Sequence, residues 1–174
     1  DSAVAIDYSQ GDSLFLHADT LLMETFHQNT DSMFREMRAF HKVRFYRTDV
    51  QGTADSLVFS TVDSCLTMYR DPIIWNKNQQ LLGEVIKVYM NDSTIDWSHI
   101  IGQALSVERV DSTIYNQVTG KEMKSYFANG EMRKTEVIGS ARVVYYPMDS
   151  DSTLIGMNVS ETSKLEIYLQ DRKI

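Results

Sequence analysis

Residues 42–90 read KVRFYRTDVQGTADSLVFSTVDSCLTMYRDPIIWNKNQQLLGEVIKVYM. In four short runs of this segment apolar side chains alternate with polar ones: Val43 and Phe45, Leu57 and Phe59, Leu66 and Met68, Ile86 and Val88. Successive side chains leave a strand on opposite faces, so a period of two over short runs indicates half-buried β-strands. The connections are too short to hold crossover helices, and neighbouring strands are therefore expected to run antiparallel.

The same pattern continues on both sides of this segment. Asp-Ser pairs precede several apolar runs, and both side chains favour turns because they hydrogen-bond to their own backbone. Asn129-Gly130 predicts a two-residue hairpin turn. We expect about 13 to 16 strands, far more than the five or six of an average sheet. They include strands at Val4–Tyr8, Leu14–His17, Ala104–Val110, Glu122–Ala128, Met132–Ile138, Ala141–Tyr146 and Lys164–Leu169.

Residues 21–41 fit two secondary structures. Met33, Met37 and Phe40 have helical spacing behind a capping Ser32, which favours a helix. Residues 37–45, however, place Met, Ala, His, Val and Phe at every second position and fit one long strand. We predict the strand, because it continues the antiparallel pattern.

Composition narrows the class of protein. The 174 residues fit one domain, 1–174, with no linker-like tract inside it. A net charge of −7 with dispersed basic residues argues against a nucleic-acid binder, which needs clustered Lys and Arg. No apolar run approaches the roughly 18 residues of a membrane-spanning helix. No secretory leader is visible, which leaves export open.

No catalytic or metal-binding motif stands out. The four histidines lack metal-ligand spacing, and His17 with Asp19 is only a weak candidate pair. Cys65 is the single cysteine, so it cannot form an internal disulfide and is expected to have a packing role. Asp149 and Asp151 are expected to lie at a solvated hairpin end rather than at a calcium site. We therefore predict neither enzymatic activity nor a cofactor.

An enzyme built on a β-solenoid is the least favoured functional hypothesis. It would use scattered carboxylates such as Asp55, Asp63 and Glu84, but local spacing fixes no carboxylate pair. The apolar face of so many strands is ordinarily a dry core. It becomes a lipid groove only if the sheets splay enough to admit acyl chains.

Several segments resemble the OstA-like family, the LptA-type periplasmic bridge proteins of lipopolysaccharide transport. GDSLFLHADTL at 11–21 and GTADSLVFS at 52–60 resemble its repeated Ala-Asp-x-Leu strand starts. TMYRDPIIWNKNQQLLGEVIKVYM at 67–90 resembles its paired strands. In 131–158, Gly139 takes the position of that family's Gly-Asn turn, with Ser140 in place of the usual Asn.

The resemblance implies an antiparallel β-jellyroll, two sheets folded like an open taco, located in the periplasm. Its interior would shield the acyl chains of lipopolysaccharide between the inner and outer membranes. The lipid-binding residues expected on that face are Phe45, Leu57, Phe59, Leu66, Met68, Ile86, Val88, Leu105, Val107 and Val144.

The resemblance also implies partners. These are related transport domains of an inner-membrane anchor and an outer-membrane translocon, and further copies joined end to end through terminal strands such as Lys164–Leu169. Residues 21–41 look longer than the tight hairpin connection of the family. Two alternatives stay open: a structural β-solenoid or sandwich scaffold with a dry core, and the periplasmic domain of the translocon itself.

Overall fold

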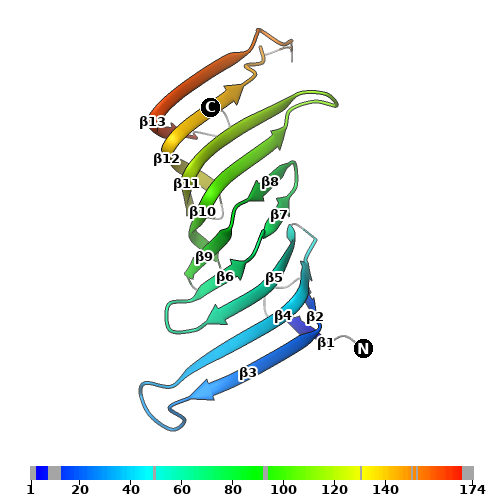
Figure 1. Ribbon diagram of the computed structural model, residues 1–174, viewed down its shortest axis with the longest axis vertical. Coiled ribbons are helices and arrows are strands. Elements are labelled where there is room, and N and C mark those ends of the chain that lie inside the picture. The colour runs from blue at the N-terminus through cyan, green and yellow to red at the C-terminus, as the bar shows by residue number, and fades with distance from the viewer. Residues whose placement is uncertain are drawn as a thin grey trace.

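The computed structural model describes residues 3–7, 13–48, 50–91, 94–129, 131–149, 151 and 153–169. Thirteen strands pair into one antiparallel sheet that climbs the long axis of the molecule (Figure 1). The predicted all-β antiparallel class is therefore confirmed. The strands are β1 (Ala3–Asp7), β2 (Leu14–Ala18), β3 (Thr20–Phe26), β4 (Phe34–Tyr46), β5 (Val50–Ser60), β6 (Cys65–Tyr69), β7 (Ile73–Asn76), β8 (Gln79–Leu82), β9 (Val85–Asn91), β10 (Thr94–Arg109), β11 (Tyr115–Ala128), β12 (Glu131–Tyr145) and β13 (Asn158–Tyr168).

Residues 21–41 form most of a hairpin between β3 and β4. The predicted long strand is confirmed, and the helical spacing of Met33, Met37 and Phe40 was misleading. Ala128 pairs with Glu131, and Asn129 has a φ of 55°, as the predicted tight hairpin requires. Gly130 and the predicted strand end at Tyr8 lie outside the described residues.

The long strands bend at aligned bulges, each of which places two residues opposite one. The two-residue sides, in β4, β10 and β12, are His41–Lys42, Gly102–Gln103 and Gly139–Ser140; the one-residue sides, in β5, β11 and β13, are Asp55, Lys121 and Ser163. Such bulges bend a strand and increase its local twist. Consequently β12 is one bent strand, where the sequence predicts two strands that end and begin at Gly139–Ser140.

All six residues on the two-residue sides have a positive φ, between 46° and 78°. A left-handed backbone costs little for glycine, which explains Gly102 and Gly139. Both glycines also lie against long side chains: an added Cβ would be 2.5 Å from Glu84 Cδ or 2.8 Å from Lys121 Cδ.

The bulges divide the sheet into two half-sheets. The first contains β3, β6, β9 and the adjoining parts of the long strands; the second contains β1, β2, β7, β8 and the remaining parts. In the middle of the molecule β5, β6, β9, β10, β8 and β7 pair in that order and return to β5, which closes a ring of six strands.

The core follows one line of cross-strand neighbours beside the bulges, which we call the central row. Each member lies directly opposite the next, and none is more than 2% exposed. This density of apolar contact makes the central row the main source of stability. The central row consists of Ala39, Leu57, Met68, Ile86, Ile100, Met123 and Val137.

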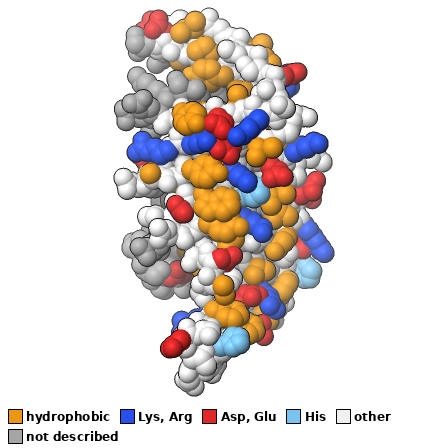
Figure 2. Space-filling view, turned by 90° about the vertical axis from the view of Figure 1, so that its left-hand side faces the viewer, with side chains coloured by type: hydrophobic (Ala, Val, Ile, Leu, Met, Phe, Trp, Pro, Cys, Tyr) orange, Lys and Arg blue, Asp and Glu red, His pale blue; other side chains and the backbone are white. Residues whose placement is uncertain are grey.

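The outer face of the first half-sheet carries aromatic and charged side chains. Tyr89 and Trp97 stack with ring centroids 4.0 Å apart, and Tyr126 lies 6.4 Å beyond Trp97. Figure 2 shows the flank at the left of Figure 1, where a column of hydrophobic side chains runs between acidic and basic ones. The described strands therefore expose some apolar surface as well as burying it.

Candidate functional site

Side-chain size changes along the interior of the fold. In the second half-sheet the inward row consists, in order, of Leu16, Phe45, Gly52, Ile74, Leu81, Ser106, Val118, Val143 and Ser160, and the ring of Phe45 covers the position of Gly52. In the first half-sheet the row next to the central row changes in the same direction. It passes from Met37, Phe59, Leu66 and Val88 to the small side chains Ser98, Ser125 and Thr135, and its last member is Ile167 on β13.

Smaller side chains leave the interior open toward the C-terminal end, where they form the feature we call the C-terminal groove. It has a volume of about 360 Å³ and is bordered by residues of β8, β10, β11, β12 and β13. That volume lies at the lower end of the range of about 300–1,000 Å³ that is typical of ligand sites. Its interior lining is Ser106, Val118, Met123, Ser125, Thr135, Val143, Ser160, Leu165 and Ile167.

Four of the predicted lipid-binding residues lie in the packed core instead of in an open groove. Leu57, Met68 and Ile86 belong to the central row, and Phe45 is buried in the second half-sheet. The face predicted for them is correct. Leu57, Met68 and Ile86 lie on strands of the closed ring and are at most 2% exposed, so they are packed into the core and do not face an open groove.

Three other predicted residues, Phe59, Leu66 and Val88, also face inward and are only half-buried. They continue the row into the hydroxyl side chains Ser98, Ser125 and Thr135, of which Ser125 and Thr135 line the groove. The prediction thus found the apolar part of this row and missed its polar part.

Leu105 and Val107 lie on the wrong face for an interior site. Their neighbours Ala104 and Ser106 are 1% and 6% exposed and point inward, so Leu105 and Val107 point outward, half-buried. Leu105 pairs with Leu82. Apolar residues occupy both faces here, so hydrophobicity alone did not identify the inner one.

Val144 also belongs to the outer-facing set. It pairs with Gln117, whereas the adjacent Val143 pairs with Val118 on the inner face. Val144 still borders the groove at its rim. Alternation extended from Val137 across the two-residue bulge to Ala141 and then to Val143 would have identified the lining residue.

A network of charges ties β13 to β12 beside the groove. The carboxylate of Glu166 accepts hydrogen bonds from Lys164 Nζ at 2.7 Å and from Tyr168 Oη at 2.8 Å. Lys134 Nζ is 3.4 Å away and also binds Glu136 at 2.6 Å. The bonds from Lys164, Tyr168 and Lys134 lower the pKa of Glu166 to about 2 from an ordinary value of 4.5.

This network predicts a pH-dependent contribution to stability. Because the folded pKa of Glu166 is lower than the unfolded one, the contribution is complete above about pH 4.5 and is lost as pH falls toward about 2. The melting temperature of wild type should exceed that of Glu166→Gln at neutral pH, and the difference should disappear by about pH 2. Glu161→Gln, which removes a carboxylate that pairs with Arg142 in the described part of the chain, is the matched control. A Glu166→Gln difference that stays constant with pH contradicts the assignment.

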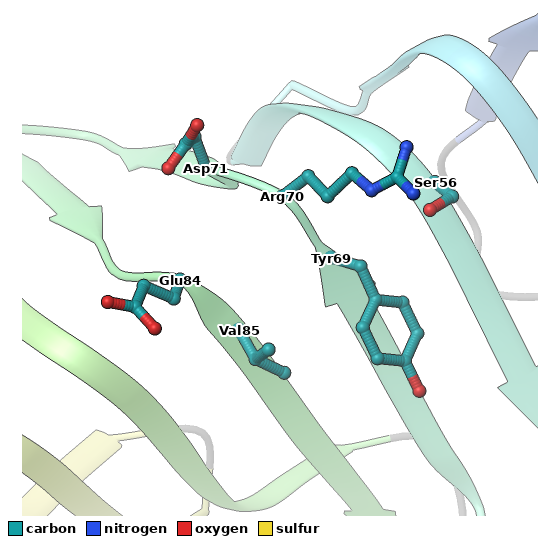
Figure 3. Close-up of a pocket in the computed structure, with 6 residues that line it drawn as sticks. All are labelled: Ser56, Tyr69, Arg70, Asp71, Glu84 and Val85. Carbon is teal, nitrogen blue, oxygen red and sulfur yellow. The ribbon is translucent and has the colours of Figure 1, made fainter.

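A second hollow lies on the outside of the bend, where β6 ends and β9 begins (Figure 3). Arg70 extends toward the strand of Ser56, and its guanidinium binds Asp55 at 3.2 Å. Asp71 and Glu84 point away from Arg70. The acidic and basic groups diverge, so the hollow offers no acid–base pair directed at a common substrate.

The other chemical candidates also have local roles. Asp63 Oδ1 accepts a hydrogen bond from the Cys65 amide, as expected for its turn, and Cys65 is buried. Asp151 Oδ1 accepts one from the Thr153 amide in the loop after β12, where hydration was predicted. Within the described ranges no group of three or more His, Cys, Asp or Glu side chains could hold a metal ion. No described helix is long and apolar enough to span a membrane.

Comparison of the chain with protein-family models and with curated proteins finds no match.

Proposed function

We propose that this chain is a periplasmic lipid-binding module that shields the acyl chains of lipopolysaccharide and passes them between the inner and outer membranes. The observation that carries the proposal is the C-terminal groove, an opening at the end of an otherwise apolar interior. The segments that resemble the OstA-like family supply the class of ligand. An acyl chain of 12 carbons could gain about 10 kcal/mol from complete burial, as an upper limit before ordering costs.

The finer fold proposed with this function is the open, taco-like β-jellyroll of that family. The aligned bulges support it, because they bend the sheet along one line and bring two half-sheets face to face. In this arrangement the ring of six strands is the closed part of the taco. The C-terminal groove is its open end.

Mass spectrometry of lipids extracted from the purified protein tests the function. The protein should be produced in the periplasm of a bacterium that makes lipopolysaccharide. We expect lipid A or its acyl chains to be recovered with the folded protein and not with a β-sheet protein of similar size purified in parallel. Recovery of no acyl lipid from a folded sample contradicts the proposal.

We further propose that copies of the chain associate end to end, and that related domains of an anchor and a translocon attach in the same way. Among the described residues β13 pairs only with β12, and β3 pairs only with β4. Unpaired strand edges of this kind accept a strand from another chain. Met23, on β3, is 70% exposed, which makes this edge apolar as well as unpaired.

Light scattering over a concentration series measures this association. The mass should rise with concentration for wild type and for Val62→Lys, which changes a residue 69% exposed in the turn between β5 and β6, outside β3 itself. It should stay at the monomer value for Met23→Lys, because a lysine on an edge strand opposes pairing. If the mass depends on concentration in the same way for both variants, β3 does not take part in the interface.

A structural module with a dry core is the second candidate. It is favoured by one observation, the exposure of 2% or less along the whole central row. A scaffold of this kind should contain no bound lipid, so the same mass spectrometry distinguishes it from the first candidate.

A further inference from the structure

Two hydroxyl side chains form a pair in the wall of the C-terminal groove. Ser125 on β11 and Thr135 on β12 lie directly opposite each other and are 7% and 5% exposed. Their oxygens are 3.0 Å apart, and Thr135 Oγ1 lies 3.0 Å from the sulfur of Met132. Both residues line the groove.

The contact with Met132 determines how the hydrogen atoms of this pair are shared. A thioether sulfur only accepts, so Thr135 donates its single hydroxyl hydrogen to Met132 Sδ. The bond between the two hydroxyls must then be donated by Ser125 to Thr135. A hydroxyl has one donor and two acceptor positions, so the pair keeps three acceptor positions and no donor.

A ligand group at this point must therefore donate a hydrogen bond. A plain hydrocarbon chain would cover the free acceptors without replacing their water, which is unfavourable. An amide would bring a carbonyl oxygen for which the pair has no donor left. A cation would place a charge among Val118, Val143 and Leu165. A hydroxyl group can donate the hydrogen bond without bringing a charge or a carbonyl oxygen into the groove.

We propose that the C-terminal groove selects acyl chains that bear a hydroxyl group, whose hydrogen is accepted by Ser125 and Thr135. This inference rests on the proposed function, since it assumes that the groove binds acyl chains. It adds a chemical preference within that class of ligand.

The test compares tetradecanoic acid with a set of its monohydroxylated forms, which differ in the position of the hydroxyl along the chain. Dissociation constants are measured by calorimetry on the full chain. At least one hydroxylated acid should bind about fivefold more tightly than the parent acid, the effect of one net hydrogen bond. In Ser125→Ala/Thr135→Val this preference should be lost while the parent acid still binds.

Two further variants keep the result interpretable. Thr67→Val removes a hydroxyl of similar burial that does not line the groove, and it should preserve the preference. Ser125→Ala alone leaves the bond from Thr135 to Met132 intact and should reduce the preference if the double variant melts too early to be used.

The outcomes separate the two proposals. Equal affinity of wild type for the parent acid and every hydroxylated acid overturns the hydroxyl preference and leaves acyl binding in place. A preference that persists in Ser125→Ala/Thr135→Val also overturns it, because a group other than these two hydroxyls must then accept the hydrogen. If no acid binds to the folded protein, both this inference and the lipid-binding function are wrong.

Discussion

Ile86→Ala is expected to lower the free energy of unfolding by about 3–4 kcal/mol, within the range for large-to-small changes in a packed core. Ile86 is fully buried and lies directly opposite Met68 and Ile100 in the closed ring. The removed atoms would leave a cavity that the ring can collapse only partly, because strands pair on all sides of it. Urea denaturation followed by circular dichroism gives the change.

Ile155→Ala is the matched control. It makes the same chemical change at a side chain 67% exposed in the loop after β12, and it should alter stability by no more than about 0.5 kcal/mol. A small loss at both positions would contradict a packed central row. A loosely packed central row would leave space for acyl chains inside the ring, and the lipid site would then not be confined to the C-terminal groove.

Val143→Asp is expected to weaken acyl-chain binding by at least about tenfold, since an unpaired carboxylate in an apolar groove costs more than about 1.4 kcal/mol. Val143 is half-buried in the groove lining, so the carboxylate is partly hydrated in the free protein and is covered when a chain binds. Calorimetry with tetradecanoic acid measures the change.

Val159→Asp is the control for this variant. Val159 is 44% exposed on the neighbouring strand β13 and does not line the groove. The Val159→Asp variant should bind acyl chains with the same affinity as wild type. Equal weakening in both variants would indicate a general effect of negative charge, and melting curves for each variant show whether the fold is kept.

Much of the fold could be predicted from local alternation. Leu66 with Met68 and Ile86 with Val88 were placed on the correct face, because each pair lies within a short strand that contains no bulge. Strand type and antiparallel pairing depend on short-range pattern and connection length, both of which are visible in the sequence.

The bend could not be predicted in the same way. The two sides of one bulge affect the alternation differently. On the one-residue side, at Asp55, the inward residues Ala54 and Leu57 are three positions apart, so the alternation is reversed. On the two-residue side, at His41–Lys42, the inward residues Ala39 and Val43 are four positions apart, so the alternation continues. Nothing local distinguishes the two cases, because the number of inserted residues is set by the partner strand. Only the pairing between strands shows which residues point inward after the bulge.

The groove was missed for a related reason. Its position depends on small and hydroxyl side chains at inward positions, and Ser125 or Thr135 taken alone indicates a solvated face. Their burial follows from their neighbours Met123 and Val137 in the central row. The groove follows from the size of the side chains along a row that crosses neighbouring strands. The hydrophobicity of residues along a single strand does not indicate it.

Photo-crosslinking to lipopolysaccharide tests the central claim most directly. A small diazirine side chain is placed in turn at Val118 in the groove, at Ile86 in the ring and at Val58, which does not line the groove. Irradiation with lipopolysaccharide should give a covalent adduct from position 118 and none from positions 86 and 58. No adduct from position 118, or equal adducts from 118 and 58, would contradict binding of acyl chains in the C-terminal groove.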